Sequence, residues 1–437
     1  MKNHDLICDN LSVNNNGELL FAGVNTVELA KKYSTPLYVL DENKIRQNCK
    51  TYYDAVKKAF LNNAGVLYAS KALSFKKIYQ IVNEENLGID VVSKGEIYTA
   101  KVAGFPLEKA YFHSNNKTDD DIVFAIDNGV GQFVVDNEEE LVAIDKICEQ
   151  KQVKKNVLLR LTPGIDPHTY DAIATGKVDS KFGSPIETGQ ALEITRLALS
   201  LKNINLLGFH CHVGSQVFDS SVYIKTVDVM FNFIYEVKEK LNFETVELDL
   251  GGGFGVKYIE SQPTIDIEKN ILEVANFIKV KANNLNVKIP KILFEPGRSI
   301  VANAGLTLYT VGTVKRIKGY KNYVSVDGGM TDNPRFALYK ADYTLVPAYD
   351  MNADRNMTCS VVGRCCESGD IIQENVSMPS TIKRGDVISC LTTGAYNYSM
   401  SSNYNKIEKA PIVMIKDKVD YLAVKRQSLE DLISQDL

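Results

Sequence analysis

Lys71 stands near the end of the apolar run Val66–Ala72, and a lysine in this position can do chemistry if it is kept away from water. A desolvated lysine gives up its proton and can form a Schiff base with a carbonyl compound. The alternative is a solvated lysine at the tip of a strand, which Lys71 alone would favour. The choice therefore depends on the residues that accompany Lys71.

Gly251–Gly253 and Arg298 could together bind a phosphate group. Three glycines let the backbone approach an anion and expose N–H donors to it, and an arginine can clamp an anion with two parallel hydrogen bonds. The spacing fits neither the dinucleotide-binding glycine motif nor a P-loop. A flexible turn is the alternative interpretation of the glycines.

Two further residues could act on a planar ring that contains nitrogen. Glu295 lies close to Arg298 in the sequence. A carboxylate beside a pyridine nitrogen favours the protonated form of that nitrogen, which makes the ring a strong electron sink. His212 could lie flat on such a ring. The structural alternatives are an ion pair between Glu295 and Arg298 and, for His212, a hydrogen-bonded core histidine.

The elements that must position these residues alternate regularly along the chain. Eight apolar runs are each followed, except the last, by a stretch of helical periodicity. Eight strands alternating with helices over roughly 250 residues predict a (β/α)8 TIM barrel. The runs are residues 66–72, 88–93, 110–115, 132–137, 157–163, 206–214, 246–253 and 292–298.

Polar residues follow or end nearly every run. Because the carboxyl ends of barrel strands form the active site in this fold, we expect these side chains to gather at one end of the barrel. Besides the residues above, the strand ends carry Asp90, His113, Arg160, His210 and Asp249.

After Arg298 the pattern changes to short strands with few long helices between them. We expect a C-terminal, mostly β domain over residues 299–437, with strands at 306–317, 323–326, 359–363, 386–391 and 412–415. The barrel domain is predicted over residues 37–298, and its first apolar run is 37–40. Residues 1–36 form an N-terminal segment with a hairpin at 11–22, which we expect to join the β domain.

Composition excludes several classes of protein. The chain has 437 residues and a formal net charge of -4, so no basic field points to nucleic acid or membrane. We expect neither a signal peptide nor a membrane span. None of the eight cysteines forms a C-x-x-C motif, so we expect no metal site. Scattered cysteines of this kind fit a reducing cytoplasm.

Taken as a set, these residues resemble the fold type III, alanine-racemase-like pyridoxal-phosphate decarboxylases. The resemblance rests on Lys71 in Tyr-Ala-Ser-Lys-Ala, His212 in His-Val-Gly-Ser, the glycine run and the segment Glu295–Arg298. Five further motifs narrow it to the diaminopimelate decarboxylase family. They are residues 179–183, 211–216, 328–335, 366–370 and 394–396.

The resemblance implies a role for each matching residue. Lys71 would hold pyridoxal 5'-phosphate, Glu295 would pair with its ring nitrogen, and His212 would stack on the ring. The remaining cofactor-binding residues would be Asp90, Ser215, Gly251, Gly252, Gly253, Pro296, Gly297, Arg298 and Tyr396.

The resemblance also implies how an amino-acid substrate is bound. Its contacts would be Arg298, Arg335, Tyr339, Cys366, Glu367 and Tyr396. Cys366 would donate a proton, and the loop that carries it would come from the second subunit of a homodimer with shared active sites. Cys365 stands beside Cys366, and spacing does not decide which thiol faces the cofactor.

The implied reaction is the decarboxylation of meso-2,6-diaminopimelate to L-lysine and carbon dioxide, the last step of lysine biosynthesis. A related decarboxylase of D-lysine, D-ornithine or another basic amino acid is the main alternative, and it would not need Arg335. A racemase would want a less electron-poor ring than Glu295 provides. A catalytically dead cofactor-binding protein would not need Lys71, Cys366 and Glu367 together.

Overall fold

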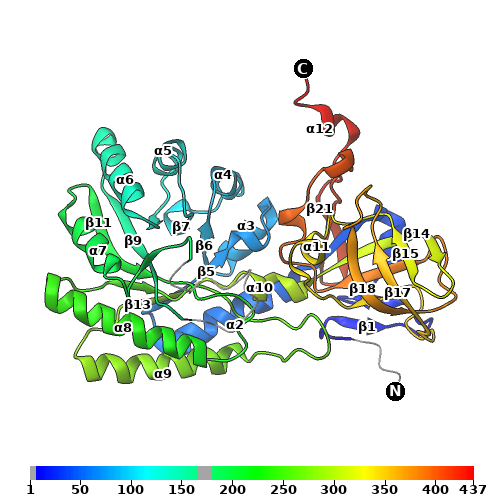
Figure 1. Ribbon diagram of the computed structural model, residues 1–437, viewed down its shortest axis with the longest axis horizontal. Coiled ribbons are helices and arrows are strands. Elements are labelled where there is room, and N and C mark those ends of the chain that lie inside the picture. The colour runs from blue at the N-terminus through cyan, green and yellow to red at the C-terminus, as the bar shows by residue number, and fades with distance from the viewer. Residues whose placement is uncertain (1–5, 166–179) are drawn as a thin grey trace. The chain divides into compact units, whose positions relative to one another are not determined.

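The computed structural model describes residues 6–165 and 180–437, and it divides the chain into two compact units. One unit, here called the barrel unit, contains Asn48–Gly255 and Thr264–Ser299. The other, the β unit, contains the chain up to Gln47 together with Val256–Pro263 and Ile300–Leu437. Figure 1 labels the elements along the chain. Asp179, the first residue of one family motif, lies outside the described residues.

The barrel unit is built on eight parallel strands that close on themselves. Each strand pairs in parallel with the next, and the ring closes where β13 pairs with β5. The strands are β5 (Ala64–Ala69), β6 (Gly88–Val91), β7 (Ala110–Phe112), β8 (Gln132–Val135), β9 (Lys155–Thr162), β11 (Ile204–His210), β12 (Glu247–Asp249) and β13 (Lys291–Phe294). The predicted (β/α)8 barrel is therefore confirmed.

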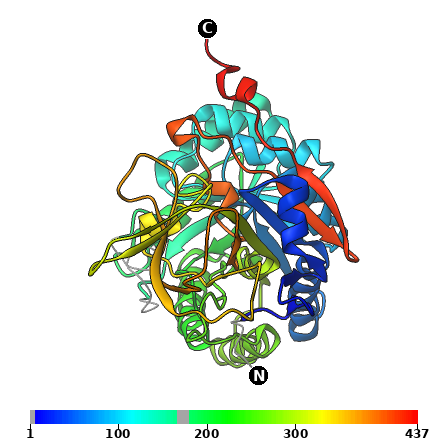
Figure 2. The same ribbon diagram turned by 90° about the vertical axis from the view of Figure 1, so that its right-hand side faces the viewer.

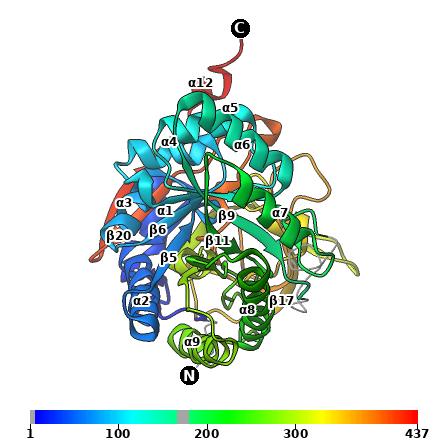
Figure 3. The ribbon, with the colours of Figure 1, turned by 90° about the vertical axis from the view of Figure 1, so that its left-hand side faces the viewer.

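Helices surround these strands, as the view along the barrel in Figure 3 shows. They are α2 (Glu42–Phe60), α3 (Lys76–Glu84), α4 (Lys94–Val102), α5 (Asp119–Asp127), α6 (Glu138–Lys151), α7 (Gln190–Ser200), α8 (Ser221–Leu241) and α9 (Ile267–Leu285). A short strand, β10 (Ser184–Pro185), pairs with β9, and α10 (Arg298–Val301) follows the last barrel strand.

Local sequence sets the ends of these helices. The side chain of Asn137 accepts a hydrogen bond from the backbone N–H of Glu140 at the start of α6, and Thr118 with Asp121 forms a capping box at the start of α5. Such caps are each worth about 1 kcal/mol. Helices α8 and α9 end at Asn242 and Asn286, which adopt the left-handed conformation that asparagine tolerates.

The interior of the barrel is filled by apolar side chains from several strands. One buried cluster joins Leu67, Tyr111, Val134, Leu158 and Leu293. Such a filled interior makes the barrel a packed core and not a pore, so the polar strand ends lie at its mouth.

The β unit contains a nine-stranded sheet. Its longest path runs β18-β17-β15-β14-β4-β20-β21, and β19 pairs with both β14 and β16. The strands are β4 (Leu37–Asp41), β14 (Gly305–Arg316), β15 (Asn322–Val326), β16 (Leu345–Val346), β17 (Met357–Val362), β18 (Ile371–Met378), β19 (Val387–Leu391), β20 (Ile412–Lys416) and β21 (Val419–Val424). All five predicted strands are confirmed, whereas β16, β18 and β21 were not predicted. The short helices are α1 (Thr26–Tyr33), α11 (Arg335–Tyr339) and α12 (Leu429–Ile433).

Strand β4 corrects the predicted start of the barrel domain at residue 37. It pairs antiparallel with β14 and parallel with β20, so it belongs to the sheet of the β unit (Figure 2). All five of its residues are buried. A short, wholly apolar run is typical of a central strand in any sheet, and the run alone does not say which sheet it joins.

The predicted N-terminal hairpin is present, with Leu11 opposite Phe21 in strands β1 (Leu11–Val13) and β2 (Leu19–Phe21). A third strand, β3 (Val24–Asn25), completes a small separate sheet. The hairpin packs into the core of the β unit against residues such as Leu308, and the N–H of Leu19 donates to the carbonyl of Ala348 at 2.9 Å. The N-terminal segment therefore joins the C-terminal strands through packing.

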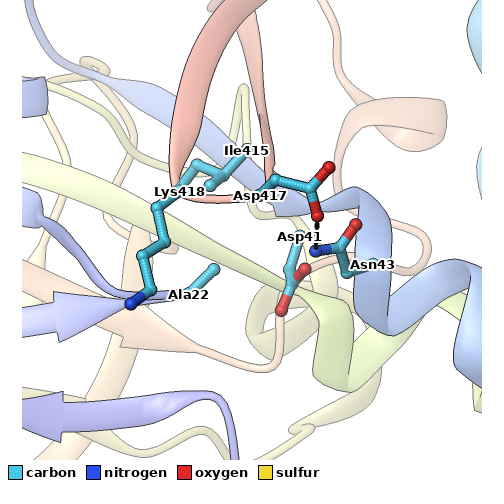
Figure 4. A pocket seen from close by; sticks show the side chains of 6 residues that line it. All are labelled: Ala22, Asp41, Asn43, Ile415, Asp417 and Lys418. Atoms are coloured by element: carbon cyan, nitrogen blue, oxygen red, sulfur yellow. Dashed lines mark hydrogen bonds between the residues drawn. The ribbon is translucent and has the colours of Figure 1, made fainter.

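A surface pocket lies beside this core. It is lined by Ala22, Asp41, Asn43, Ile415, Asp417 and Lys418 (Figure 4). Asn43 donates to Asp417 at 3.0 Å, and Asp41 accepts from Asn10 and from the backbone of Lys44. Asp41, Asn43 and Asp417 thus form hydrogen bonds within the protein and stabilise local structure. Within the described ranges, none of the helices combines the length and the apolar composition that a membrane span requires.

Candidate active site

Lys71 lies in a single 3-10 turn, Ser70–Ala72, directly after β5. Its two neighbours in the turn are buried, whereas Lys71 itself is exposed. The hydroxyl of Tyr68 donates to the carbonyl of Leu73 at 2.8 Å and so fixes the turn. Lys71 is thus held at the carboxyl end of a barrel strand, where the sequence placed it.

Glu295 follows β13 and is held between two histidines. Its Oε1 lies 2.8 Å from Nε2 of His113, and its Oε2 lies 3.0 Å from Nε2 of His210. The two imidazole rings meet edge to face, with their centroids 4.9 Å apart. Burial pushes the pKa of Glu295 upward, but electrostatic attraction to the imidazoles of His113 and His210, and hydrogen bonds from them, outweigh burial and hold this pKa well below its usual range. Glu295 is therefore a buried carboxylate that stays ionised.

His210 is uncharged at neutral pH. Burial lowers the pKa of His210 to about 4, against the opposing charge of Glu295. A neutral imidazole can donate only from the nitrogen that carries its proton, so the 3.0 Å contact places that proton on Nε2. The donor orients the carboxylate without neutralising it.

Two buried aspartates lie near Glu295. Burial raises the pKa of Asp90, while His113, with a nitrogen 3.8 Å from the Asp90 carboxylate, and Lys71 oppose the rise. Burial and the charge of Glu295 together raise the pKa of Asp249 well above its usual range. Both aspartates are therefore easier to protonate than Glu295.

The glycine run Gly251–Gly253 follows β12, and its backbone leaves no room for side chains. A Cβ on Gly252 would lie 2.1 Å from the carbonyl oxygen of Glu295, and one on Gly253 would lie 2.3 Å from that of Gly214. Gly251 has a φ of +70°, in the left-handed region that favours glycine. The run is required for close packing of three strand ends, so a merely flexible turn is excluded.

Arg298 and Ser215 meet beside the glycine run. The Nε and one terminal nitrogen of Arg298 lie 3.3 Å and 3.0 Å from Oγ of Ser215. Gly297 brings this segment against the Lys71 turn, because a Cβ there would lie 2.9 Å from Cβ of Ala69. The N–H of Ala69 also donates to the carbonyl of Pro296 at 3.2 Å. The ends of the first and last barrel strands are therefore joined directly.

His212 lies in the loop after β11. The N–H of Gly252 donates to its Nδ1 at 3.3 Å. Burial, followed by the positive charges of Lys71 and Arg160, holds the pKa of His212 well below its usual range. A neutral imidazole beside the glycine run could stack on the face of a planar ring, as expected for His212.

These groups fit pyridoxal phosphate. The cofactor needs an amine for its carbonyl carbon, an anion for its ring nitrogen, and donors for its phosphate. The barrel mouth offers Lys71, the ionised Glu295 and, for the phosphate, the glycine run with Ser215 and Arg298. The glycine run is also backbone that a ligand can approach closely, because it carries no Cβ.

Sequence reasoning gave no role to four residues that the fold brings to this mouth. They are His113, His210, Arg160 and Asp249. Arg160 lies over the ring of Phe182 and 3.9 Å from Asp136. All four were visible as polar residues at strand ends. Their convergence on Glu295 depends on closure of the barrel. The sequence therefore predicts that they stand at strand ends but not that they meet at Glu295.

His113, His210 and Glu295 also form the one group of potential metal ligands among the described residues. The prediction of no metal rested on cysteine spacing and stays a prediction. Oε2 of Glu295 is hydrogen-bonded to His210, and Oε1 lies 2.8 Å from Nε2 of His113, so the carboxylate already faces two imidazole nitrogens.

The β unit contains a second polar group, centred on Arg335 at the start of α11. The guanidinium carbon of Arg335 lies 5.6, 5.9 and 5.5 Å from the ring centres of Tyr258, Tyr343 and Tyr396. Arg335 is buried, and no carboxylate among the described residues lies within ion-pair distance of it. A buried cation in an aromatic cage is suited to an anionic ligand.

Tyr396 and Tyr339 differ in their surroundings. Tyr396 is partly buried and has a φ of +64°, a strained conformation for a tyrosine that is common at functional sites. Tyr339, at the end of α11, is 40% exposed. The structure places Tyr396 beside Arg335 and leaves Tyr339 at the surface of the chain.

Cys366 and Glu367 lie at the exposed tip of the loop between β17 and β18. Buried Asp370 anchors the base of this loop, because it accepts from the N–H of Cys365 at 2.7 Å and from that of Met330 at 2.6 Å. The tip therefore projects from a rigid base. Cys365 is partly buried, whereas Cys366 is exposed.

The fold and the strand-end groups define a barrel decarboxylase that depends on pyridoxal phosphate, and comparison with known proteins agrees. Residues 42–302 match the family model described as "Pyridoxal-dependent decarboxylase, pyridoxal binding domain". This match covers the segment that carries Lys71, the glycine run and Glu295.

Relatives that match nearly the whole chain show which family of pyridoxal-dependent decarboxylases it belongs to. The diaminopimelate decarboxylase of Bacillus methanolicus is 43% identical over 95% of this chain and 96% of its own length, and that of Bacillus subtilis (strain 168) is 41% identical over 97% and 96%. The crystal structure of diaminopimelate decarboxylase from M. jannaschii in complex with L-lysine superimposes with a TM-score of 0.91, at 32% identity and 98% coverage of both chains. The chain belongs to the diaminopimelate decarboxylase family.

Proposed function

We propose that the protein removes one carboxylate from meso-2,6-diaminopimelate and so forms L-lysine and carbon dioxide, with pyridoxal 5'-phosphate as its cofactor. The observation that carries the proposal is a buried, ionised Glu295 at the same end of the barrel as Lys71 and the glycine run. Membership of the diaminopimelate decarboxylase family supports the same reaction.

In this proposal the barrel residues hold the cofactor. Lys71 binds its carbonyl carbon through the side-chain amine, and Glu295 pairs with its ring nitrogen. His212 lies against the ring. The phosphate is bound by Ser215, Gly251–Gly253, Gly297, Arg298 and Tyr396, with Asp90 and Pro296 among the nearby contacts. When bound, the cofactor supplies an electron sink for the electron pair that departing carbon dioxide leaves behind.

Glu295 keeps this sink strong. His113 and His210 hold the carboxylate in place at 2.8 and 3.0 Å and favour its charged form. An ionised carboxylate beside a ring nitrogen stabilises the nitrogen's positive charge. The ionised state of Glu295 thus supports a decarboxylase over a racemase, which would gain from a less electron-poor ring.

Substrate selection is proposed to lie with Arg335 and Glu367. Arg335 offers two parallel hydrogen bonds to the distal carboxylate of diaminopimelate, and Glu367 offers a partner for the distal ammonium. Arg298, Tyr339 and Tyr396 complete the substrate contacts. Lysine and ornithine lack the distal carboxylate, so binding them would leave the buried guanidinium of Arg335 without a counter-ion.

Cys366 is proposed to return a proton to the α-carbon after carbon dioxide has left. Cys366 and Glu367 are exposed on a loop that Asp370 anchors, and this exposure supports contact with a second copy of the chain. We therefore propose a homodimer in which this loop completes the site of the second copy. We also propose a cytoplasmic location. All eight cysteines are free thiols, which supports a reducing compartment.

A substrate panel tests the assignment. Carbon dioxide release is measured with meso-diaminopimelate and with both enantiomers of lysine and ornithine. A site built for a polar group rejects an analogue that lacks the group by roughly 10⁴-fold or more. We therefore expect kcat/KM for meso-diaminopimelate to exceed kcat/KM for each enantiomer of lysine and ornithine by about this factor. Comparable kcat/KM for D-lysine or D-ornithine would replace our assignment with the related basic amino-acid decarboxylase.

Arg335→Ala should remove most of this preference while the visible absorbance of the bound cofactor stays. Lys340→Ala is the matched control, because it removes the same charge from an exposed position next to α11. If the control loses the same preference, the effect is one of overall charge and not of Arg335.

A further inference from the structure

Asp370 holds two separate segments of the β unit together through one carboxylate. Its Oδ1 accepts from the N–H of Met330 at 2.6 Å, and its Oδ2 accepts from the N–H of Cys365 at 2.7 Å. Asp370 is only 3% exposed. Because a buried N–H group that loses its acceptor is costly, the two segments are held to the same carboxylate and therefore to each other.

The two segments also pack backbone against backbone. The N–H of Arg364 donates to the carbonyl of Gly328 at 3.1 Å. A Cβ on Gly363 would lie 2.5 Å from Cα of Gly329 and 2.3 Å from Oδ2 of Asp370. No side chain fits between the segments, so a shift of one segment displaces the other.

The first segment leads directly to Arg335. The N–H of Asn333 donates to the carbonyl of Gly329 at 2.8 Å, and the N–H of Gly329 donates to Oδ1 of Asp332 at 3.0 Å. Asp332 and Asn333 are buried as well, and helix α11 begins at Arg335, just after this turn. A displacement at Gly329 would therefore reach Arg335 through a closed turn.

The second segment leads to Cys366 and Glu367. The N–H of Gly363 donates to the carbonyl of Asp370 at 3.0 Å, and the N–H of Asp370 donates to the carbonyl of Glu367 at 3.1 Å. The loop is thus closed on Asp370 from both sides. The place from which Cys366 and Glu367 project is set by the same residue that holds the Arg335 segment.

We propose that Asp370 is a positioning residue that serves both active sites of the dimer at once. The proposal rests on the proposed function, in which Arg335 binds substrate in the site of its own chain, whereas the loop with Cys366 and Glu367 completes the site of the second copy. Asp370 acts through these residues. It sets where Arg335 lies in one site and where the loop lies in the other.

The two roles have different kinetic signatures. Arg335 is proposed to bind only the distal carboxylate, so its displacement should raise KM for meso-diaminopimelate and leave kcat nearly unchanged. The loop carries both the proposed partner of the distal ammonium and the proposed proton donor, so its displacement should raise KM and lower kcat. A general loss of stability would reduce the amount of active protein but would leave KM unchanged.

Mixed dimers with one working site separate these roles. One chain, the loop chain, carries Lys71→Ala and supplies the loop with Cys366 to the working site. The other, the cofactor chain, carries Cys366→Ala and supplies Lys71 and Arg335. Mixed dimers are isolated with two different affinity tags and loaded with cofactor, and Asp370→Ala is placed on one chain or the other. Carbon dioxide release then gives kcat and KM for the one working site.

On the cofactor chain, Asp370→Ala should raise KM about tenfold and change kcat by less than about twofold, since misplacing a binding group by about 1 Å can cost up to about 100-fold. On the loop chain, the same change should raise KM and lower kcat, each by about tenfold. Asp386→Ala is the matched control. Asp386 accepts from the N–H of Lys383 at 2.9 Å in the next loop of the same sheet, and its loss from either chain should leave both constants unchanged.

An unchanged KM with Asp370→Ala on either chain overturns the proposal, because Asp370 would then serve one site or none. Thermal unfolding shows that each mixed dimer is folded. If the alanine chain does not fold, Asp370→Asn takes its place. Asparagine offers one acceptor and one donor, so it must break one of the two hydrogen bonds, and an unchanged KM in both placements overturns the proposal. Mixed dimers that are inactive without any change at Asp370 would reject shared sites, and this proposal with them.

Discussion

Replacing Glu295 by glutamine isolates the charge of this residue from its shape. Glutamine has the same heavy-atom framework, so it can keep the positions that lie 2.8 Å from His113 and 3.0 Å from His210. Its amide oxygen accepts one hydrogen bond, and a neutral imidazole can change tautomer to accept from the amide nitrogen. The fold should therefore survive the change, while the negative charge is lost.

The size of the effect follows from the ring nitrogen that Glu295 is proposed to face. An opposite charge within hydrogen-bonding distance shifts a pKa by roughly 1–3 units, and each unit is about 1.4 kcal/mol. Without the carboxylate, the protonated ring loses roughly 1.4 to 4 kcal/mol of stabilisation, and the barrier of the decarboxylation step rises by up to this amount. Turnover should fall about 10- to 1000-fold. The phosphate contacts that we propose for Ser215, Arg298 and the glycine run are untouched, so cofactor affinity should fall by less than about tenfold.

The assay measures kcat for carbon dioxide release at saturating cofactor, and the cofactor dissociation constant by titration of the protein after the cofactor has been removed. His210→Gln serves as the matched control: it keeps a neutral hydrogen-bond donor near Oε2 of Glu295 and leaves the carboxylate ionised. Its kcat should fall less than that of Glu295→Gln. Equal losses of kcat and cofactor affinity in Glu295→Gln would mean that Glu295 only supports the structure, and an unchanged kcat would refute the electron-sink role.

Three further outcomes are expected. Lys71→Ala should abolish both turnover and the visible absorbance of the bound cofactor, and survival of both would remove Lys71 from its proposed role. If the sites are shared, mixing inactive Lys71→Ala with inactive Cys366→Ala should restore about a quarter of the activity, because half the dimers are mixed and each has one intact site of two; no recovery after verified subunit exchange would reject sharing. Burial raises the pKa of Asp332 to about 7, so the folded state holds this proton more tightly than the unfolded state, and the stabilisation is lost as pH rises from about 4 to 7. Asp332→Asn should flatten this decline in urea unfolding, and an unaltered pH profile would contradict it.

The main features of the fold could be predicted because they depend on local patterns. Strand and helix periods repeat eight times between residues 66 and 298, and each period is set by neighbours a few residues apart. The strand-end positions of Lys71, Gly251–Gly253 and Glu295 follow from the same patterns. Of the strands missed in the nine-stranded sheet, β16 has two residues and β18 is rich in polar residues, so pairing and not composition makes these two segments strands. The third, β21, is a mostly apolar strand at the edge of the sheet.

Strand β4 shows where a local pattern is insufficient. Its apolar residues predict burial, which the structure confirms, but not which sheet buries them. Tyr258 is a similar case: it lies just after the glycine run in sequence, yet its ring lies beside Arg335 of the β unit. Sequence neighbours do not determine either contact, because both depend on segments that meet only after the chain has folded.

The sequence by itself determined the barrel, the glycine run and which polar residues stand at strand ends, because each depends on residue types close together in the chain. Only the tertiary structure decided that His113 and His210 converge on Glu295 and that three tyrosines enclose Arg335. The physical reason is that a closed barrel brings the ends of β7, β11 and β13 together across its mouth, where burial and close contact set the charge of Glu295. Charge state in a buried site depends on distances between side chains, and those distances exist only in the folded chain.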